Sequence, residues 1–353
     1  MKVFYLTISL FLFSCSKRVE DKCFVDKMNT EDVVIWENVP QSYTLNQILA
    51  EKPNYLEITN LTAYRDFETD KEEFLLRKRG GITEISFSVF DEKFSDQFVC
   101  FGKQKSGNTI YGLGMNRLGY WLLKIENNRP SAHFLGLSSN LYYFNKIQQN
   151  PIVQGDKIHI EGSLVKMENP IDRGGYKNYA VIEDGKLFTV KMEDLVQDSD
   201  HDGYNDIFEN SFGLNPHKKD TDGDGINDFE DKNPMFRSLD NKFTRLYDQL
   251  LSDTFVGAEN LNYEFQVYKT DCEYFHQVNP SQKVLFVSED KKKQTYYTRV
   301  SDIIEEIISP IQKNKKNPDS FYIYKAGTFY KKDYSADYEN GKWVLKVVGG
   351  YVI

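Results

Sequence analysis

Two short acidic loops in tandem constrain this chain more than any other feature of its sequence. The first is DSDHDGYNDIFE, residues 198–209, and the second is DTDGDGINDFED, residues 220–231. In both loops acidic residues stand at positions 1, 3, 5, 9 and 12, and a glycine stands at position 6. Alternate carboxylates at the first three positions converge on one centre, and the glycine permits the sharp turn that this requires. This spacing is typical of calcium-binding loops.

Each position predicts a different kind of ligand. Position 7 contributes its backbone carbonyl, position 9 often acts through a water, and position 12 completes the coordination. Glutamate at position 12 of the first loop can bind calcium with both oxygens, whereas aspartate is shorter, so we expect the second site to be weaker or closed differently. The predicted ligands of the first loop are Asp198, Asp200, Asp202, Tyr204, Asp206 and Glu209. Those of the second are Asp220, Asp222, Asp224, Ile226, Asp228 and Asp231.

The acidity of the chain is concentrated in this region. Residues 198–231 hold eleven acidic residues and two lysines, a net charge of −9, which equals the formal net charge of the whole chain. Two carboxylates about 4 Å apart repel each other by roughly 4 kcal/mol at an effective dielectric constant of about 20. We therefore expect the loops to open without a divalent cation. The remaining charges balance, and no basic stripe predicts nucleic-acid binding.

Residues 198–234 resemble bacterial thrombospondin type 3 calcium repeats, in the segments DSDHDGYNDIFE, GLNP and DTDGDGINDFEDKNP. By position, the resemblance implies calcium ligands at the five acidic positions of each loop. It covers about a tenth of the chain and is specific for calcium, but not for a biological role. Such repeats usually occur in longer arrays, whereas this chain has two, and the cysteines of the animal repeats are absent. An extended calcium-coated rod is therefore not expected.

Two other classes of calcium-binding protein have similar loops. A paired EF-hand or a dockerin needs a helix after each loop, and a dockerin usually stands at a chain end. A short helix is predicted from Asn205 to Phe212, ended by Gly213. The second loop is followed by Asn233 and Pro234, which stop a helix. The thrombospondin-like interpretation is therefore preferred.

The N-terminus is typical of an exported bacterial lipoprotein. Lys2 precedes an apolar run, residues 3–13, which as a helix would span about 16 Å of a bilayer core that is roughly 30 Å thick. The run ends in Leu-Phe-Ser-Cys, which resembles a lipobox and implies acylation of Cys15 after cleavage. The phenylalanine is bulkier than usual there, and a plain signal peptide is the alternative. Ser16, directly after the cysteine, favours sorting to the outer membrane. The lipid on Cys15 would anchor the chain to that membrane.

Three cysteines remain besides Cys15: Cys23, Cys100 and Cys272. They allow at most one disulfide within the chain, with three possible pairings. An exported chain meets an oxidising compartment, which permits such a bond. A buried free thiol is equally natural for Cys100, which lies in an apolar strand.

The pattern predicts a mixed fold with an N-terminal mostly-β domain (a sandwich or barrel), a central calcium-binding loop module and a C-terminal α+β domain. We place a signal peptide at residues 1–14, a tether at 15–31, the β-rich domain at 32–196, the module at 197–235 and the α+β domain at 236–353. The N-terminal elements expected are a helix at 45–51, strands at 82–89, 98–102, 109–113, 120–125, 132–137 and 157–166, and a hairpin of 179–182 with 186–190 around Asp184-Gly185. Those expected after the module are a helix at 243–251, strands at 263–268, 284–287 and 321–324, a helix over 303–308 and a hairpin around Asn340-Gly341.

No motif predicts catalysis. None of the five histidines stands in a spaced metal-binding set, and neither G-x-S-x-G nor a P-loop occurs. We therefore expect a calcium-binding envelope lipoprotein in which calcium stabilises the junction between two domains of binding or scaffold type, with a protein or glycan ligand. The alternatives are a secreted hydrolase acting on glycans, whose carboxylate pair would have no local motif, and a subunit of an envelope secretion or uptake assembly.

Overall fold

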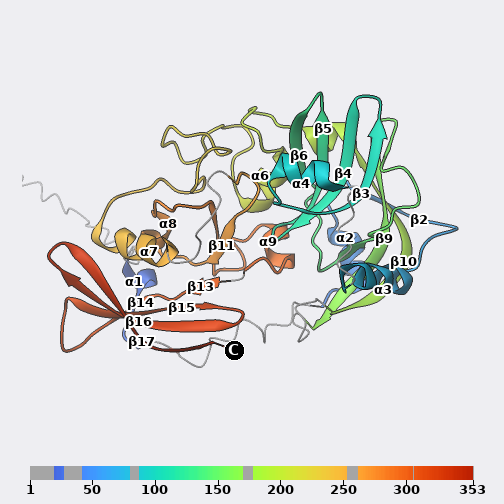
Figure 1. Cartoon of the computed structure of the whole chain (residues 1–353). Helices are drawn as coiled ribbons and strands as arrows, with labels where there is room; N and C mark the ends of the chain where they lie inside the picture. The colour runs from blue at the N-terminus through green and yellow to red at the C-terminus, as the bar shows by residue number, and fades with distance from the viewer. Residues whose placement is uncertain are drawn as a thin grey trace, which may run out of the picture.

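The computed structural model describes residues 20–27, 42–79, 87–169, 178–252, 261–304 and 306–352. The fold is mixed, with several antiparallel sheets, and the acidic loops lie between two groups of sheets (Figure 1). This confirms the predicted mixture of elements and the place of the loops. The signal segment and Cys15 lie outside the described residues, so the lipoprotein signal stays a prediction. Among the described helices, none is long and apolar enough to cross a membrane.

Two antiparallel sheets form the N-terminal half. One has the order β3-β4-β5-β6, and the other has the order β2-β10-β9-β7, with β8 also pairing with β9. The strands of the first sheet are β3 (Val99–Ser106), β4 (Thr109–Asn116), β5 (Gly119–Glu126) and β6 (Arg129–Phe134). Those of the second are β2 (Glu57–Asn60), β7 (Tyr142–Phe144), β8 (Val153–Gln154), β9 (Lys157–Asn169) and β10 (Asn178–Lys191).

Helices border these sheets. They are α2 (Leu45–Glu51), α3 (Phe67–Arg79), α4 (Ser88–Phe94) and α5 (Met192–Val196). The helix predicted at 45–51 is confirmed, and a capping box begins it, because the Thr44 side chain accepts from Gln47 N–H and the Gln47 side chain accepts from Thr44 N–H.

The C-terminal half is built on a six-stranded sheet and a parallel pair. The large sheet has the order β1-β14-β15-β16-β17, with β13 also pairing with β15, and β11 pairs with β12 in parallel. Its strands are β1 (Phe24–Val25), β13 (Glu306–Ile308), β14 (Ile311–Lys313), β15 (Ser320–Gly327), β16 (Tyr330–Glu339) and β17 (Lys342–Val352). The parallel pair is β11 (Gln266–Lys269) and β12 (Val284–Val287), and the helices are α1 (Glu20–Cys23), α7 (Lys242–Ser252), α8 (Glu273–His276) and α9 (Tyr296–Val300).

A disulfide joins the start of the described chain to this half. Cys23 is bonded to Cys272, and Cys100 is free. Residues 20–27 fall within the segment predicted as a tether, yet β1 pairs with β14 and Cys23 lies in the C-terminal hydrophobic core. A disulfide of this kind is typical of proteins outside the reducing cytoplasm.

Several predicted elements are confirmed. The strands expected at 98–102, 109–113, 120–125, 157–166 and 284–287 lie in or overlap β3, β4, β5, β9 and β12. The helix after the first acidic loop is α6 (Asp206–Phe212), and Gly213 ends it in the left-handed conformation, with φ +83°. The hairpin around Asn340-Gly341 joins β16 to β17.

The hairpin predicted around Asp184-Gly185 is wrong. The two segments form one long strand, β10, whose register shifts twice where it passes this dipeptide. Gly185 has φ +62°, and the Asp184 carboxylate accepts hydrogen bonds from Ser163 Oγ (2.6 Å) and from Phe67 N–H (2.9 Å). The dipeptide therefore makes a β-bulge rather than a turn, because groups on β9 and α3 hold it in line.

Two further predictions fail in part or whole. Of the strand expected at 82–89, residues 82–86 lie outside the described residues, and Ser88 and Val89 begin α4 instead. The helix expected over 303–308 is wrong, because α9 ends at Val300 and β13 pairs with β15 in this region. Its isoleucines favour an extended chain, and β15 offers them a partner that the local pattern does not reveal.

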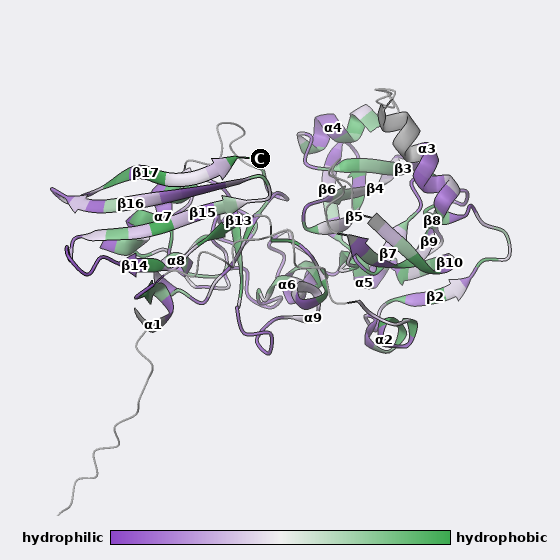
Figure 2. Cartoon of the chain, turned by 90° about the horizontal axis from the view of Figure 1, so that it is seen from below, coloured by the Kyte–Doolittle hydropathy of each residue, from purple (hydrophilic) through white to green (hydrophobic). Residues whose placement is uncertain are grey.

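One hydrophobic core spans both halves. It contains Trp121 of β5, Phe144 of β7, Phe208 of α6 and Tyr297 of α9, together with Phe265 beside β11. Seen from below, α6 and α9 lie between the two groups of sheets (Figure 2). A second core lies under the C-terminal sheet, around Leu246, Phe275 and Trp343. The acidic loops are thus fastened to the protein interior through α6.

Candidate metal centre

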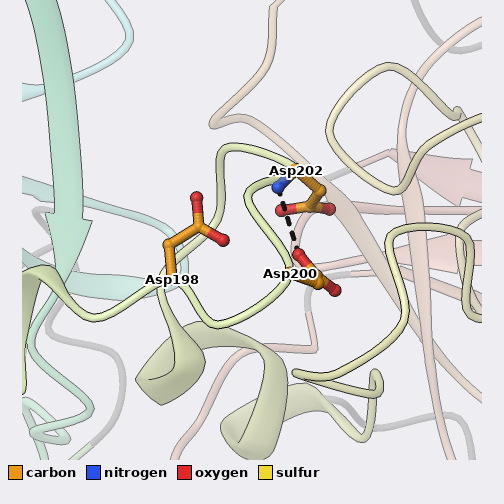
Figure 3. Close-up of side chains that lie close together, drawn as sticks. All are labelled: Asp198, Asp200 and Asp202. Carbon is orange, nitrogen blue, oxygen red and sulfur yellow. Dashed lines mark hydrogen bonds between the residues drawn. The ribbon is translucent and has the colours of Figure 1, made fainter.

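The first acidic loop is folded by its own carboxylates. Asp198 accepts hydrogen bonds from the backbone N–H groups of His201 (2.7 Å) and Gly203 (3.2 Å). Asp200 accepts from Asp202 N–H (3.1 Å), as the dashed line in Figure 3 marks. One oxygen from each of these three aspartates lies within 4.8 Å of the others. The loop therefore gathers the first three predicted ligands around one point.

The second loop repeats this arrangement. Asp220 accepts from Gly223 N–H (2.7 Å) and Gly225 N–H (2.9 Å), and Asp222 accepts from Asp224 N–H (2.9 Å). The side-chain oxygens of these three aspartates also lie within 4.8 Å of one another. Two aspartate triads that could hold metal ions thus stand in tandem.

The aspartates at position 9 have a further role in each loop. Asp206 accepts from Ser199 N–H (2.8 Å) and Ser199 Oγ (2.7 Å), so both of its oxygens hold the residue at position 2. Asp228 holds Thr221 in the same way, at 2.9 and 2.7 Å. These hydrogen bonds join the two ends of each loop. They hold the loop closed whether or not the same carboxylates also bind a metal.

Five buried carboxylate oxygens in the two loops have no hydrogen-bond partner among the described residues. They are Oδ2 of Asp200, Oδ2 of Asp202, both oxygens of Glu209, and Oδ2 of Asp222. A buried anionic oxygen without a partner is costly, because it has lost water and gained nothing in exchange. All five belong to residues at predicted ligand positions, so the residues present fit a bound cation.

The raised pKa values of the loop carboxylates also fit a bound cation. Burial, followed by the charges of Asp200 and Asp202, raises the pKa of Glu209 to about 9. Burial and neighbouring carboxylates also raise the pKa of Asp202 to about 7. In the second loop, burial is the main reason that the pKa values of Asp222 and Asp228 rise to about 6. The site thus disfavours its own negative charge unless a positive charge joins it.

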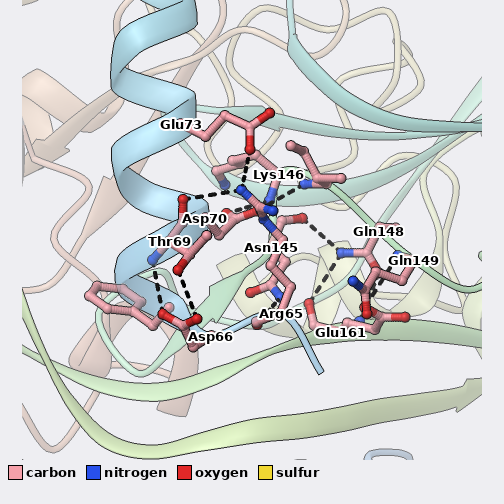
Figure 4. Close-up of polar contacts among 12 residues, drawn as sticks. Arg65, Asp66, Thr69, Asp70, Glu73, Asn145, Lys146, Gln148, Gln149 and Glu161 are labelled. Carbon is pink, nitrogen blue, oxygen red and sulfur yellow. Dashed lines mark hydrogen bonds and ion pairs between the residues drawn. The ribbon is translucent and has the colours of Figure 1, made fainter. Parts of the chain in front are cut away.

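A second polar cluster in the same molecule shows the contrast (Figure 4). Asp70 is fully buried, and it accepts hydrogen bonds from Tyr143 Oη, the N–H groups of Lys146 and Ile147, and Arg65 Nε, at 2.8–3.2 Å. Glu161 is 1% exposed, and it accepts from Gln149 N–H and from Asn150. Both of these buried carboxylates are therefore satisfied by the protein itself, which sets Glu209 apart.

Three side chains fasten the loops to the flanking sheets. Asn205 donates to the carbonyl oxygens of Phe134 on β6 (3.0 Å) and Leu195 on α5 (2.8 Å). Asn233 donates to the carbonyl oxygens of His276 (2.7 Å) and Val278 (3.0 Å), beyond the second loop. The two acidic loops are thereby tied to the N-terminal sheet on one side and the C-terminal half on the other.

The third of these side chains is Lys283, just before β12. Its ammonium group donates to the carbonyl oxygens of Phe229 and Asp231, both at 2.7 Å. Burial lowers the pKa of Lys283 to about 8, although the charges of Asp231 and Asp202 oppose this. This buried cation stands close to the second loop and partly offsets its negative charge.

The remaining predicted ligands differ in what their side chains do. The Tyr204 ring is buried against Phe208, and its hydroxyl donates to the Asn262 carbonyl at 2.5 Å, whereas the Ile226 side chain is 46% exposed. Their predicted role rests on the backbone carbonyl, so it does not depend on either side chain. Asp231 is 7% exposed and accepts from Asn233 N–H (2.9 Å), so one of its oxygens is already engaged.

Sequence reasoning missed Lys283, Asn205 and Asn233 as parts of this centre. Lys283 is separated from Asp231 by 52 positions, and no local pattern connects the two. Cys272 and His276, four positions apart, are not available as a pair of metal ligands, because Cys272 is in the disulfide and His276 Nε2 lies 3.0 Å from the Thr270 carbonyl oxygen. In comparisons with known proteins, no family model, curated protein or solved structure matches this chain.

Proposed function

We propose that each acidic loop binds one calcium ion, and that calcium holds together the junction between the two halves of an exported envelope protein. The observation that carries this proposal is Glu209, which is fully buried with both oxygens unpartnered among the described residues. It interacts with the charges of Asp200 and Asp202, whose free oxygens are buried as well. A hard divalent cation that takes six to eight oxygens is the chemistry that satisfies such a set.

The proposed ligands are those that the loop spacing and the resemblance to thrombospondin type 3 repeats imply. Calcium fits better than a transition metal because every donor in the set is an oxygen, from a carboxylate or a backbone carbonyl, and none is nitrogen or sulfur. The ion would neutralise carboxylates that otherwise repel one another beside α6 and the second loop. Because these elements are tied to both halves through Asn205, Asn233 and Lys283, neutralising them stabilises the whole junction.

The proposed location is the cell envelope, where Cys15 carries the lipid that anchors the chain to the outer membrane. Extracellular calcium modules can use weak sites, with dissociation constants of about 10⁻⁴ to 10⁻³ M. The disulfide between Cys23 and Cys272 supports this location, since such bonds form in oxidising compartments. Metabolic labelling with palmitate tests the anchor: the wild-type chain should be labelled and the Cys15→Ser variant should not.

Calorimetric titration of the mature chain with calcium tests the sites themselves. Two sites are expected. Asp200→Asn combined with Asp202→Asn should remove the first, and Asp222→Asn combined with Asp224→Asn should remove the second. Glu230→Gln is the matched control, because Glu230 lies in the same segment, is exposed and stands at no ligand position. Three or more sites in the wild-type chain, or the loss of both sites in either double variant, would contradict one ion per loop.

Limited proteolysis and thermal unfolding test the structural role. Chelation should lower the midpoint of unfolding and expose residues 198–240 to cleavage, because the repelling carboxylates would then be unpaired. If chelation changed neither the midpoint nor the cleavage pattern, calcium would bind without holding the junction.

A further inference from the structure

A cleft lies beside the first acidic loop, and the calcium chemistry does not account for it. Its volume is about 610 Å³, which is within the range of about 300–1,000 Å³ usual for ligand pockets. Residues of α2, α5, α6 and α9 line it, with the turn after α2, and it is open to solvent. These four short helices come from segments far apart in the sequence, so only the tertiary fold creates the cleft.

The lining is rich in hydrogen-bonding groups and carries negative charge. Three carboxylates line it, those of Glu51, Asp194 and Asp206, and no lysine, arginine or histidine stands among the described residues of the lining. The other polar groups are amides and hydroxyls: Asn54, Gln197, Asn210, Ser211 and the tyrosines. Three tyrosines line the cleft, at positions 55, 296 and 297. Tyr297 is only 3% exposed, so the half-buried rings of Tyr55 and Tyr296 supply the flat apolar surfaces.

One tyrosine hydroxyl at this cleft is buried without a hydrogen-bond partner among the described residues. It belongs to Tyr296, which lines the cleft. Burial raises the pKa of Tyr296 to about 12, which keeps its hydroxyl protonated and able both to donate and to accept.

We propose that this cleft binds a neutral, hydroxyl-rich ligand of the saccharide class. Three carboxylates repel an anionic ligand. An ammonium group only donates, and it would leave the hydrogen of the buried Tyr296 hydroxyl unmatched, whereas a sugar hydroxyl both donates and accepts. Arg299 lies 4.0 Å from Glu51 and over the Tyr296 ring, so its positive charge already offsets part of the negative charge of the cleft. The tyrosine rings offer surfaces for the apolar faces of a sugar.

Helix α6 connects this cleft to the acidic loop. Asp206, Ile207 and Asn210 line the cleft, whereas Glu209 of the same helix is buried beside Asp200 and Asp202. One short helix therefore forms a wall of the cleft with one face and closes the first loop with another. This part of the inference rests on the proposed function: calcium bound in the first loop fixes α6, and ligand affinity in the cleft becomes calcium-dependent.

Calorimetric titration of the mature chain carrying Cys15→Ser tests the inference, with millimolar calcium present. The probes are the trisaccharides maltotriose, cellotriose, laminaritriose and triacetylchitotriose, with spermidine and inorganic phosphate as the cationic and anionic comparisons. At least one trisaccharide should bind with a stoichiometry of one. Tyr296→Phe should weaken that binding by about tenfold, as expected for the loss of one hydrogen bond. Asp194→Asn should also weaken it, whereas Glu193→Gln, on the same helix with a 77% exposed side chain, should not.

The inference is overturned if none of the trisaccharides binds, if only spermidine or phosphate binds, or if Tyr296→Phe and Asp194→Asn leave the affinity unchanged. Repeating the titration in chelator should weaken trisaccharide binding at least tenfold, and Glu209→Gln should remove that difference. The two proposals can fail separately. Trisaccharide binding in a chain that binds no calcium would refute the proposed function and the calcium dependence of the cleft, but not the saccharide site. Calcium binding without trisaccharide binding would refute the inference alone.

Discussion

Replacing Glu209 by glutamine should have opposite effects on stability with and without calcium. The side chain is fully buried, and its oxygens accept no hydrogen bond from any described residue. Glutamine keeps the shape and removes the charge. Without calcium the substitution removes the cost of burying a carboxyl group beside Asp200 and Asp202, where it must take up a proton, whereas with calcium it removes a ligand that can use both oxygens.

The magnitude without calcium follows from the pKa. The pKa of Glu209 rises from its ordinary value of 4.5 to about 9 in the fold. Between pH 4.5 and pH 7.5 the unfolded chain loses this proton and the folded chain keeps it, so stability falls by about 1.4 kcal/mol per pH unit, or about 4 kcal/mol in total. Glu209→Gln should recover up to that amount at pH 7.5 in chelator. The gain should shrink to about 0.4 kcal/mol at pH 4.5, where the unfolded side chain is half protonated, and vanish at lower pH.

The magnitude with calcium follows from mass action. At free calcium 100 times the dissociation constant, one site stabilises the folded chain by about 2.7 kcal/mol. If the substitution weakens that site 100-fold, the same calcium concentration contributes only about 0.4 kcal/mol. The assay is urea unfolding at pH 7.5 and pH 5, in chelator and in calcium, with Glu230→Gln as the exposed control. Equal destabilisation by Glu209→Gln in chelator and in calcium would refute the reasoning, because Glu209 would then be an ordinary packed side chain.

Three further variants test the connections around the loops. Lys283→Met should cost about 2–4 kcal/mol in urea unfolding, because the carbonyl oxygens of Phe229 and Asp231 lose a charged donor, whereas Lys232→Met, at an exposed position, should cost little. Cys23→Ser combined with Cys272→Ser should lower the unfolding free energy by about 3–5 kcal/mol, and a reducing agent should then have no further effect on that variant. Ser199→Ala removes the 2.7 Å hydrogen bond to Asp206 and should cost about 1 kcal/mol, measured by the same unfolding. Calcium titration of Ser199→Ala should show a weaker first site and an unchanged second site, and weakening of both would contradict the independence of the two loops.

Features that depend on near neighbours could be predicted from the sequence. The spacing of aspartates and glycine in each loop identified both triads, because those oxygens converge through hydrogen bonds within a few residues. The helix at Leu45–Glu51, the end of α6 at Gly213 and the turn at Asn340-Gly341 were predictable for the same reason, since caps and turns are local. The resemblance of the loops to thrombospondin type 3 repeats and the lipid anchor at Cys15 remain predictions.

The surroundings of those features depend on contacts between distant parts of the chain. Asp184-Gly185 has the composition of a turn, but Ser163 on the next strand holds it in a bulge. The pairing of Cys23 with Cys272, the approach of Lys283 to the second loop and the isolation of the Glu209 oxygens join segments that are distant along the chain. Whether two such distant residues meet is set by the packing of the whole core, and no local sequence pattern encodes it. The spacing of acidic residues therefore identified side chains that could bind a metal. The fold determined which of their oxygens are buried without a hydrogen-bond partner among the described residues.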